Sequence, residues 1–137
     1  MEKLMQFNYL YYKLSQRLST FKDWPFLEDC NCTPQKMAEA GFVYQPCESQ
    51  PDVAVCFFCF KELEGWEPND NPWEEHQKHS RSCRFLTNLP SWETLTLEQL
   101  IKLENERMNN LIRKVDSQHT AEFEAKVQEV RIKLQNL

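Results

Sequence analysis

The longest regular pattern of apolar and polar positions lies in the last third of the chain. Residues 96–137 contain neither proline nor glycine, and apolar side chains recur there at steps of three and four, apart from a gap at His119, as on one face of a helix. Thr96 and Gln99 form a capping-box pattern at the start of this interval. It predicts one long helix whose apolar stripe consists of Met108, Leu111, Val115, Phe123, Val127, Val130 and Leu134.

This predicted helix is too long to be covered by the rest of the chain. About forty residues at 1.5 Å each extend for roughly 60 Å, more than a domain of about 70 residues can cover. The stripe therefore predicts partner helices, because a soluble monomer rarely exposes so much apolar area. Two alternatives remain open, in which the helix folds back on the domain or is a solvated, charge-laced rod.

The middle of the chain has the opposite character. All seven prolines and both glycines lie between residues 25 and 90, so turns are frequent and elements are short there. Residues 33–41 and 71–79 each begin with a capping residue followed by proline, which predicts two short helices. Between them, β-branched and aromatic stretches within residues 41–66 predict a small antiparallel sheet of three strands.

These patterns predict an α+β fold with three parts. They are an N-terminal extension (1–16), a compact domain (17–90), and a linker with the long C-terminal helix (91–137). From the extension to Leu18, five apolar residues are spaced like one helical face, and we expect them to pack against the tail or a second subunit. These residues are Leu4, Phe7, Tyr11, Leu14 and Leu18.

Composition and charge narrow the class of partner. The chain is 41% hydrophobic and 12% aromatic, which is globular rather than disordered. Its net charge of -5 argues against binding a nucleic-acid backbone, which needs a basic face. The N-terminus lacks the apolar stretch of a secretory signal, and no window of about 18 uncharged apolar residues occurs. We therefore expect an intracellular chain with reduced cysteines.

The clearest chemical signal is a set of cysteines and a histidine at metal-ligand spacing. Cys56 and Cys59 form a C-x2-C pair, His76 follows after sixteen residues, and Cys83 follows after six more. A tight turn places two thiolates together, and a later His and Cys can complete a tetrahedron around one zinc ion. Since protein would fill all four positions, the ion would be structural. The alternative is that these are buried free cysteines.

Spacing alone leaves the identity of the histidine ligand open. His79 lies three residues after His76 and shares a helix face with it. A RING needs about eight ligands, but only Cys30, Cys32, Cys47 and two histidines remain, so a ubiquitin ligase is not expected. A nucleic-acid zinc finger needs a histidine pair with three to five residues between them, whereas only two residues separate His76 and His79, which also lie among acids.

Several stretches together resemble one known family. They are residues 17–25 (RLSTFKDWP), 37–42 (MAEAGF), 52–59 (DVAVCFFC), 63–66 (LEGW), 72–76 (PWEEH) and 83–85 (CRF). This pattern is similar to the baculovirus inhibitor-of-apoptosis repeat, or BIR domain, over about residues 17–86. A single repeat followed directly by a long helix resembles the members of the family that act in cell division. The resemblance assigns His76, rather than His79, as the fourth zinc ligand.

The resemblance also implies a groove beside the third strand for peptides with a free N-terminal small residue. Glu64 and Asp70 would hold the amine, and Leu63 and Trp66 would wall a shallow pocket for an alanine methyl group. The sequence is compatible with this role, because six acids and no Lys or Arg lie between residues 62 and 75 and would attract a positive ligand. The alternative for these acids is a solvated face.

At the other end of this groove, Lys61 and His79 would meet a phosphorylated third residue, as in a histone H3 tail phosphorylated on its third-position threonine. His79 could instead be a surface or capping residue, and Trp66 could belong to the core. Asn69 and Asn71 depart from the pattern of the related proteins, which have aspartates there. We expect weaker contact with an arginine at the second position of the peptide.

For the long helix, the resemblance implies borealin and inner centromere protein as partners in a helical bundle that anchors Aurora B kinase. Trp92, Leu97 and Leu100 occupy positions that resemble the family's homodimer contact. Thr33, before Pro34, resembles a proline-directed phosphorylation site, although helix N-capping explains it without a kinase.

Two functions from different classes follow from the resemblance, and neither is enzymatic. The first is an adaptor of the chromosomal passenger complex in the nucleus, at the centromere, spindle and midbody, and in the cytoplasm. The second is an inhibitor of apoptosis that binds caspases or Smac-like peptides through the same groove. The long helix favours the adaptor, since caspase antagonism by a BIR domain does not need it.

Overall fold

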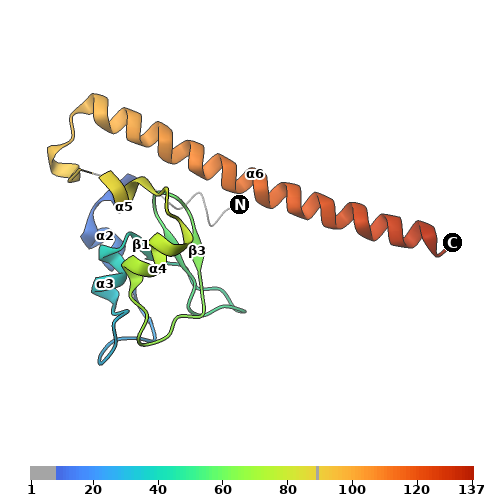
Figure 1. The fold of residues 1–137 in the computed structure, drawn as a ribbon, viewed down its shortest axis with the longest axis horizontal. Coiled ribbons are helices and arrows are strands. Elements are labelled where there is room, and N and C mark those ends of the chain that lie inside the picture. Colours follow the sequence, from blue (N-terminus) through green and yellow to red (C-terminus); the bar gives the residue numbers. More distant parts are fainter. Residues whose placement is uncertain (1–8, 89) are drawn as a thin grey trace.

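In the computed structural model, which describes residues 9–88 and 90–137, a three-stranded sheet surrounded by short helices is joined to one long helix (Figure 1). The elements in chain order are η1 (Tyr9–Tyr12), α2 (Leu14–Leu18), α3 (Pro34–Glu39), β1 (Phe42–Tyr44), β2 (Ala54–Cys56), β3 (Glu62–Leu63), α4 (Pro72–His79), α5 (Arg84–Asn88), η2 (Trp92–Thr94) and α6 (Leu97–Gln135). This arrangement confirms the predicted α+β fold.

The sheet is antiparallel with the order β1-β2-β3, as predicted. Val43 of β1 pairs with Val55 of β2, and Ala54 of β2 pairs with Leu63 of β3. Both β1 and β2 are buried along their whole length, because helices and loops cover both faces. The strands are shorter than the apolar stretches suggest, since the chain leaves β2 at Cys56 to form a tight turn.

Side-chain caps fix the starts of three helices. The Thr33 hydroxyl accepts a hydrogen bond from the Lys36 N–H at 3.4 Å, and Asn71 Oδ1 accepts from two N–H groups of α4 at 3.0 and 3.4 Å. At α6, Thr96 and Gln99 exchange bonds of 3.2 and 2.9 Å in a capping box. All three predicted helix starts are confirmed.

The N-terminal extension does not form the single helical face that its spacing predicts. Lys13 has an extended backbone (φ −82°, ψ 128°) that separates η1 from α2, so Tyr11 and Leu14 lie on different elements. Tyr11 packs against the core, whereas Leu14 is 37% exposed. Leu4 and Phe7 lie outside the described residues. The amine of Lys13 lies 4.8 Å from the centre of the Trp92 ring, which confirms contact between this extension and the start of the tail.

Arg17 joins the extension to the compact domain. Its side chain is buried, and its Nε donates to the Ala38 carbonyl at 2.8 Å, while an NH group donates to the Tyr11 carbonyl at 2.7 Å. The guanidinium also lies 5.0 Å from the centre of the Phe57 ring, a favourable cation–π contact. Leu18, one residue later, packs against a buried cluster that includes Phe21, Trp24 and Phe42.

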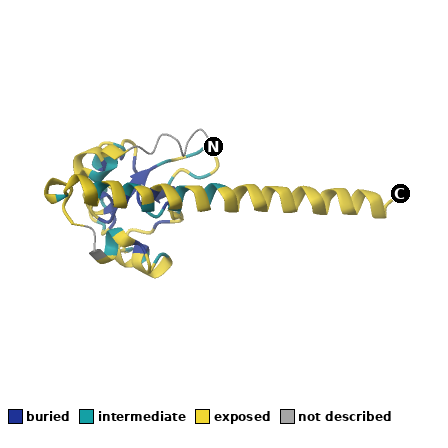
Figure 2. Cartoon of the chain, turned by 90° about the horizontal axis from the view of Figure 1, so that it is seen from above, coloured by how far each residue is buried: buried dark blue, intermediate teal, exposed yellow. Residues whose placement is uncertain are grey.

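The long helix has two parts with different surroundings (Figure 2). In its proximal part (97–115), Leu103 is only 4% exposed and belongs to a core cluster with Val55 and Phe57. Leu111 and Val115 pack against this cluster. In its distal part (116–137), every residue is exposed. The helix therefore docks on its own domain at one end and projects into solvent at the other.

This docking corrects the predicted partner-facing stripe at two positions. Leu111 and Val115 face the chain's own domain, because the chain reverses between α5 and α6 and brings the proximal helix back over the sheet (Figure 1). The alternative of a folded-back helix thus holds for the proximal part. The other predicted stripe residues are exposed, namely Met108 at 43%, Phe123 at 70%, Val127 at 40%, Val130 at 54% and Leu134 at 64%.

Candidate functional site

Four side chains from separate elements converge beside the sheet. Cys56 ends β2, Cys59 lies in the following turn, His76 is on α4, and Cys83 precedes α5. Their ligating atoms all lie within 4.8 Å of one another, and three of the four residues are buried. Across residues 9–88 and 90–137, no second group of three or more potential metal ligands of this kind occurs.

The turn from Cys56 to Phe60 brings two of these thiols together. The Phe60 N–H donates to the Cys56 carbonyl at 3.0 Å, and Phe60 has a φ of +62°, which is uncommon for a bulky residue. The backbone N–H groups of Phe58 and Cys59 approach the Cys56 sulfur at 3.4 and 3.5 Å. Such donors favour the thiolate form and hold the sulfur in place.

His76 is oriented by a contact on the far side of its ring. Its Nδ1 lies 2.7 Å from the Ala40 carbonyl oxygen, which can only accept, so Nδ1 carries a proton and Nε2 faces the cluster. Nε2 is 3.4 Å from the Cys59 sulfur. Histidines that bind metals are commonly held in this way. His79 is instead a surface residue whose Nε2 lies 3.5 Å from the Glu75 carboxylate.

Interactions within the cluster separate the pKa values of its members. Hydrogen bonds from Cys56 and Cys83 hold the pKa of Cys59 well below its usual range, whereas burial raises the pKa of Cys56. Burial lowers the pKa of His76, but the sulfurs of Cys59 and Cys83 outweigh burial and raise this pKa to about 9. The four groups are thus close enough to share protons, as expected of side chains whose donor atoms face one centre.

The donor set and its spacing fit a zinc ion. Zinc–sulfur bonds of about 2.3 Å in a tetrahedron require sulfur–sulfur separations of about 3.8 Å, and the Cys56 and Cys83 sulfurs are 3.9 Å apart. A disulfide would need about 2.05 Å. Three thiols and one imidazole would fill all four positions of the tetrahedron, so the cluster could hold a zinc ion without any open position.

The expected peptide groove lies along the edge of the sheet. Among the described strands, β3 is an edge strand that pairs only with β2. Lys61 precedes this strand and Glu64 follows it, and both are exposed, whereas Leu63 is half-buried. An edge strand of this kind can pair with an extended peptide through its main chain.

Two of the predicted groove residues also have structural contacts. Trp66 is only 6% exposed, its indole N–H donates to the Leu63 carbonyl at 3.2 Å, and its backbone N–H donates to the Asp52 carboxylate at 2.8 Å. Trp66 is thus chiefly a core residue, with little surface left for a ligand. The Asp70 carboxylate accepts from the Glu67 N–H at 2.8 Å and closes a turn.

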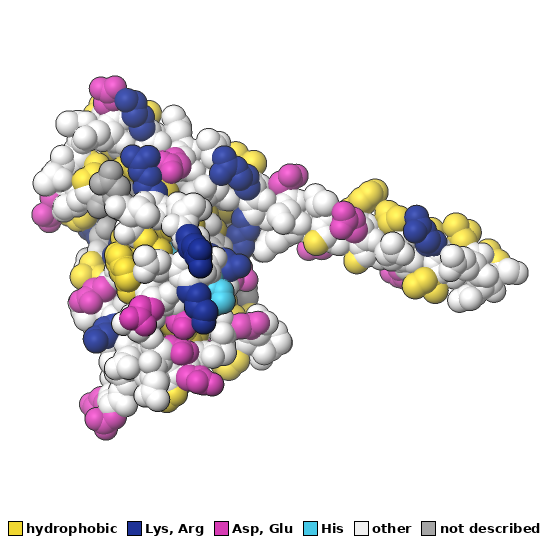
Figure 3. All heavy atoms as spheres, in the orientation of Figure 1, with side chains coloured by type: hydrophobic (Ala, Val, Ile, Leu, Met, Phe, Trp, Pro, Cys, Tyr) yellow, Lys and Arg dark blue, Asp and Glu magenta, His cyan; other side chains and the backbone are white. Residues whose placement is uncertain are grey.

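Charge is unevenly distributed along β3. At its start, Glu62 forms an ion pair of 3.0 Å with Lys114 of α6, next to the exposed Lys61. Beyond its end lie the acids Glu64, Glu67, Asp70 and Glu74. Figure 3 shows acidic side chains over the lower half of the compact domain and basic ones between them and the long helix.

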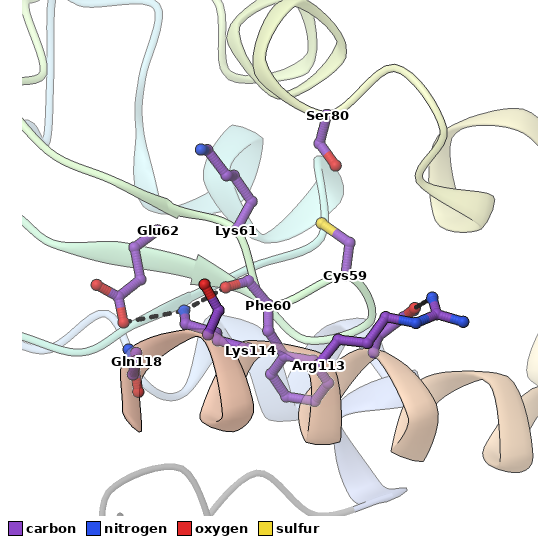
Figure 4. Close-up of a pocket in the computed structure, with 10 residues that line it drawn as sticks. Cys59, Phe60, Lys61, Glu62, Ser80, Arg113, Lys114 and Gln118 are labelled. Carbon is purple, nitrogen blue, oxygen red and sulfur yellow. Dashed lines mark hydrogen bonds and ion pairs between the residues drawn. The ribbon is translucent and has the colours of Figure 1, made fainter. Parts of the chain in front are cut away.

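Helix α6 contacts the turn from Cys56 to Phe60, which the sequence alone does not predict. The Asn110 side chain donates to the Phe58 carbonyl at 3.1 Å, and the Lys114 ammonium donates to the Phe60 carbonyl (Figure 4). In the sequence, the only sign is that these two polar residues lie four apart on either side of Leu111. These two contacts depend on the tertiary fold and could not be predicted from local spacing.

The remaining predicted positions lie at the surface or at a helix start. Trp92 is 43% exposed and Leu97 is 75% exposed, while Leu100 is half-buried near the start of α6. Thr33 is half-buried and serves as the N-cap of α3. None of the helices described has the length and apolar character needed to cross a bilayer.

Comparisons with known proteins identify the family to which the chain belongs. The family model described as the BIR, or Inhibitor of Apoptosis, domain matches residues 17–87. Baculoviral IAP repeat-containing protein 5 (survivin) of Mus musculus is 52% identical over 126 residues, covering 92% of this chain and 90% of that protein. Baculoviral IAP repeat-containing protein 5.2 of Xenopus tropicalis is also 52% identical over 126 residues, covering 92% of this chain and 81% of that protein.

A solved structure is similar in fold. The crystal structure of DIAP1 BIR1 bound to a Grim peptide has a TM-score of 0.51 and 28% sequence identity, covering 69% of this chain and 90% of that one. The autoinhibited dIAP1-BIR1 domain gives a TM-score of 0.50 at the same identity.

Proposed function

The chain belongs to the inhibitor-of-apoptosis family of BIR proteins, and from this premise we propose that it is a non-enzymatic adaptor of the chromosomal passenger complex. In this role the compact domain reads the histone H3 tail phosphorylated on its third-position threonine. The long helix binds borealin and inner centromere protein, and this scaffold carries Aurora B kinase to chromosomes for segregation and cytokinesis. The corresponding locations are the nucleus, centromere, spindle and midbody, with a further pool in the cytoplasm.

The charge pattern along the β3 edge supports binding of a peptide there. A peptide that pairs with this edge would place its α-amine near Glu64 and Asp70, where opposite charge stabilises it. Its first side chain would lie against Leu63, and its phosphorylated third side chain would lie near Lys61 and His79. The His79 imidazole would offer that phosphate a ring N–H donor.

The buried position of Trp66 supports selectivity for a small first residue. Because the indole is covered by the core and hydrogen-bonded to the Leu63 carbonyl, it would leave a ligand only a small and fixed floor. A floor of this kind suits an alanine methyl group, whereas a larger side chain would have to displace packed atoms.

The zinc ion has a structural role in this proposal. Cys56, Cys59, His76 and Cys83 would hold it, and when bound it cross-links β2, α4 and the start of α5. Since these elements are short, such a cross-link would keep the β3 edge rigid. Four protein donors leave no position for an activated water, in agreement with a non-enzymatic role.

The observation that carries the adaptor proposal is the distal part of α6. Every residue from 116 to 137 is exposed, yet Phe123, Val130 and Leu134 lie on one face with exposed fractions of 70%, 54% and 64%. An unpaired apolar face on a helix is the kind of surface that a helical bundle covers. Peptide binding by the compact domain would not require it.

Self-association is a further part of the proposal. Trp92, Leu97 and Leu100 lie around η2 and the start of α6, and Leu97 is 75% exposed. These side chains would form a homodimer contact that is separate from the distal stripe.

A second candidate function is inhibition of apoptosis through binding of caspases or Smac-like peptides. The similar DIAP1 BIR1 structure contains a Grim peptide, and the same β3 edge would serve here. The two functions differ in their need for a phosphate at the third residue and for the distal helix.

One titration separates these functions. Binding of fluorescent Ala-Arg-Thr-Lys peptides, with and without phosphate on threonine, is compared with binding of Ala-Val-Pro-Ile to the full chain. We expect the phosphopeptide to bind tightest and its N-acetylated form to lose binding. Asp70→Asn keeps an acceptor for the Glu67 N–H but removes the charge, so it should weaken binding about tenfold. Equal affinities for the free and acetylated peptides would refute the claim that the groove recognises a free N-terminal amine.

The tail is tested by recruitment of the two scaffold partners. Phe123→Glu with Val130→Glu puts charge into the apolar stripe and should abolish co-purification with borealin and inner centromere protein. Ala125→Glu adds a charge on the opposite helix face and should leave it intact. If the stripe variant still recruits both partners, the proposed helical bundle of α6 with these partners is wrong.

A further inference from the structure

A cleft of about 510 Å³ lies between the metal-binding turn and the proximal part of α6 (Figure 4). Lys61 and Glu62 at the start of β3 line one wall together with Ser80 after α4. Asn110 and Arg113 of α6 line the other wall. The cleft therefore exists only because the long helix folds back over the domain.

Positive charge predominates in this cleft. Its lining contains three basic residues and one acid. The acid, Glu62, is neutralised by Lys114, whose side chain is only 16% exposed and which also contacts the Phe60 carbonyl. Lys61 and Arg113 are exposed and supply the remaining charge.

Arg113 is suited to bind an anion. Its guanidinium lies along α6, 3.4 Å from the Asn110 side-chain oxygen (Figure 4). A hydrogen bond of that length is weak, so the exposed side chain can turn toward a ligand at little cost. A guanidinium can bind a carboxylate or phosphate with two parallel hydrogen bonds. The side chain of Ser80 lines the same cleft as a further polar group.

The direction of the proposed peptide leads into this cleft. With its amine near Glu64 and its third residue near Lys61, the peptide runs antiparallel to β3, from the end of the strand toward its start. An extended chain advances about 3.3 Å per residue. The fourth to sixth residues would therefore pass Lys61 and enter the space beside Arg113.

From this placement we infer that the cleft is a subsite for an acidic or phosphorylated side chain among residues four to six of the bound peptide. The inference rests on the function proposed above for the β3 edge. The groove is acidic at the end that receives the amine and basic at the end that continues into the cleft. A matching ligand has a positive N-terminus followed by negative charge downstream.

The test uses octapeptides that begin Ala-Arg-phosphothreonine and carry Glu at position four, five or six, or phosphothreonine at position six. Binding to the full chain is measured by fluorescence anisotropy against the parent peptide. At least one substituted peptide should bind about threefold to tenfold tighter. Arg113→Ala should remove this gain, whereas Arg131→Ala, which removes the same charge from the distal helix, should keep it.

Two results would overturn the subsite. One is equal affinity for all peptides, and the other is a gain that persists in Arg113→Ala. If binding still requires the free amine in either case, the proposed groove stands and only the subsite fails. If N-acetylated and free peptides bind alike, the groove itself fails and the subsite fails with it.

Discussion

The Asn110 side-chain amide donates a hydrogen bond of 3.1 Å to the Phe58 carbonyl, in the middle of the turn that carries Cys56 and Cys59. Lys114, one helical turn later, contacts the Phe60 carbonyl of the same turn. The long helix and the candidate metal centre are therefore joined directly, so the tail is part of the structure that positions the ligands.

Asn110→Ala should weaken this attachment of α6 to the turn from Cys56 to Phe60. It leaves the Phe58 carbonyl without its donor, which costs about 1 kcal/mol in the free energy of unfolding. It should also speed transfer of zinc to a competing chelator, because the turn that holds two ligands becomes more mobile. Stopped-flow chelation and denaturant unfolding measure the two effects. Asn109→Ala, at an exposed neighbouring position, is the control. Equal zinc-transfer rates and unfolding free energies for the two variants would show that the hydrogen bond of Asn110 does not stabilise the turn.

Glu104 and Arg107 predict a pH-dependent contribution to stability. Arg107 is 2% exposed, and its Nε lies 2.8 Å from the Glu104 carboxylate. Burial alone would raise the pKa of Glu104, but the hydrogen bonds and charge of Arg107 lower it below its usual 4.5. This carboxylate therefore stabilises the fold above about pH 4.5, and its contribution is lost as pH falls through the lowered pKa.

Glu104→Gln should thus cost about 1 to 2 kcal/mol at pH 7, less than for a fully buried pair because Glu104 is partly exposed. The difference in unfolding free energy between parent and variant should shrink between pH 5 and pH 3. Protonation of the metal ligands affects both proteins alike, so the difference isolates Glu104. A difference that stays constant with pH would show that this pair contributes no pH dependence.

Gly41 and Gly65 provide a matched pair for backbone strain. Both have a positive φ, +93° and +72°. A Cβ at Gly41 would lie 2.8 Å from the Phe85 ring, whereas a Cβ at Gly65 would meet nothing within 4 Å. Gly65→Ala should cost about 1 kcal/mol from strain alone, and Gly41→Ala clearly more because the ring must move. Equal unfolding free energies for the two variants would mean that the contact with Phe85 is unimportant.

The sequence predicts much of the fold because its local signals are strong. Thr33, Asn71 and Thr96 are side-chain caps followed by helical patterns, and the structure starts helices at each of them. The C-x2-C spacing of Cys56 and Cys59 likewise requires a tight turn, and the structure contains it. These features depend on a few neighbouring residues, so they can be read without knowledge of tertiary contacts.

Long-range features could not be predicted in the same way. The sequence pattern assigns Leu111 and Phe123 to one apolar stripe of α6, but only the reversal before the helix decides that Leu111 meets the domain and Phe123 meets solvent. The Glu62–Lys114 ion pair joins residues that are 52 positions apart. Spacing also leaves His76 and His79 equivalent, and the contact with the Ala40 carbonyl separates them in the structure.

The zinc content of the purified, reduced chain tests the central claim most directly. Elemental analysis of the parent and of Cys83→Ser, each followed by thermal unfolding, gives the metal content together with its effect on the fold. We expect one zinc ion per parent chain, and in the variant a loss of zinc together with a large fall in Tm. A parent chain without stoichiometric zinc, or a variant that lacks zinc yet unfolds at the parent's temperature, would contradict a fold held by this metal centre.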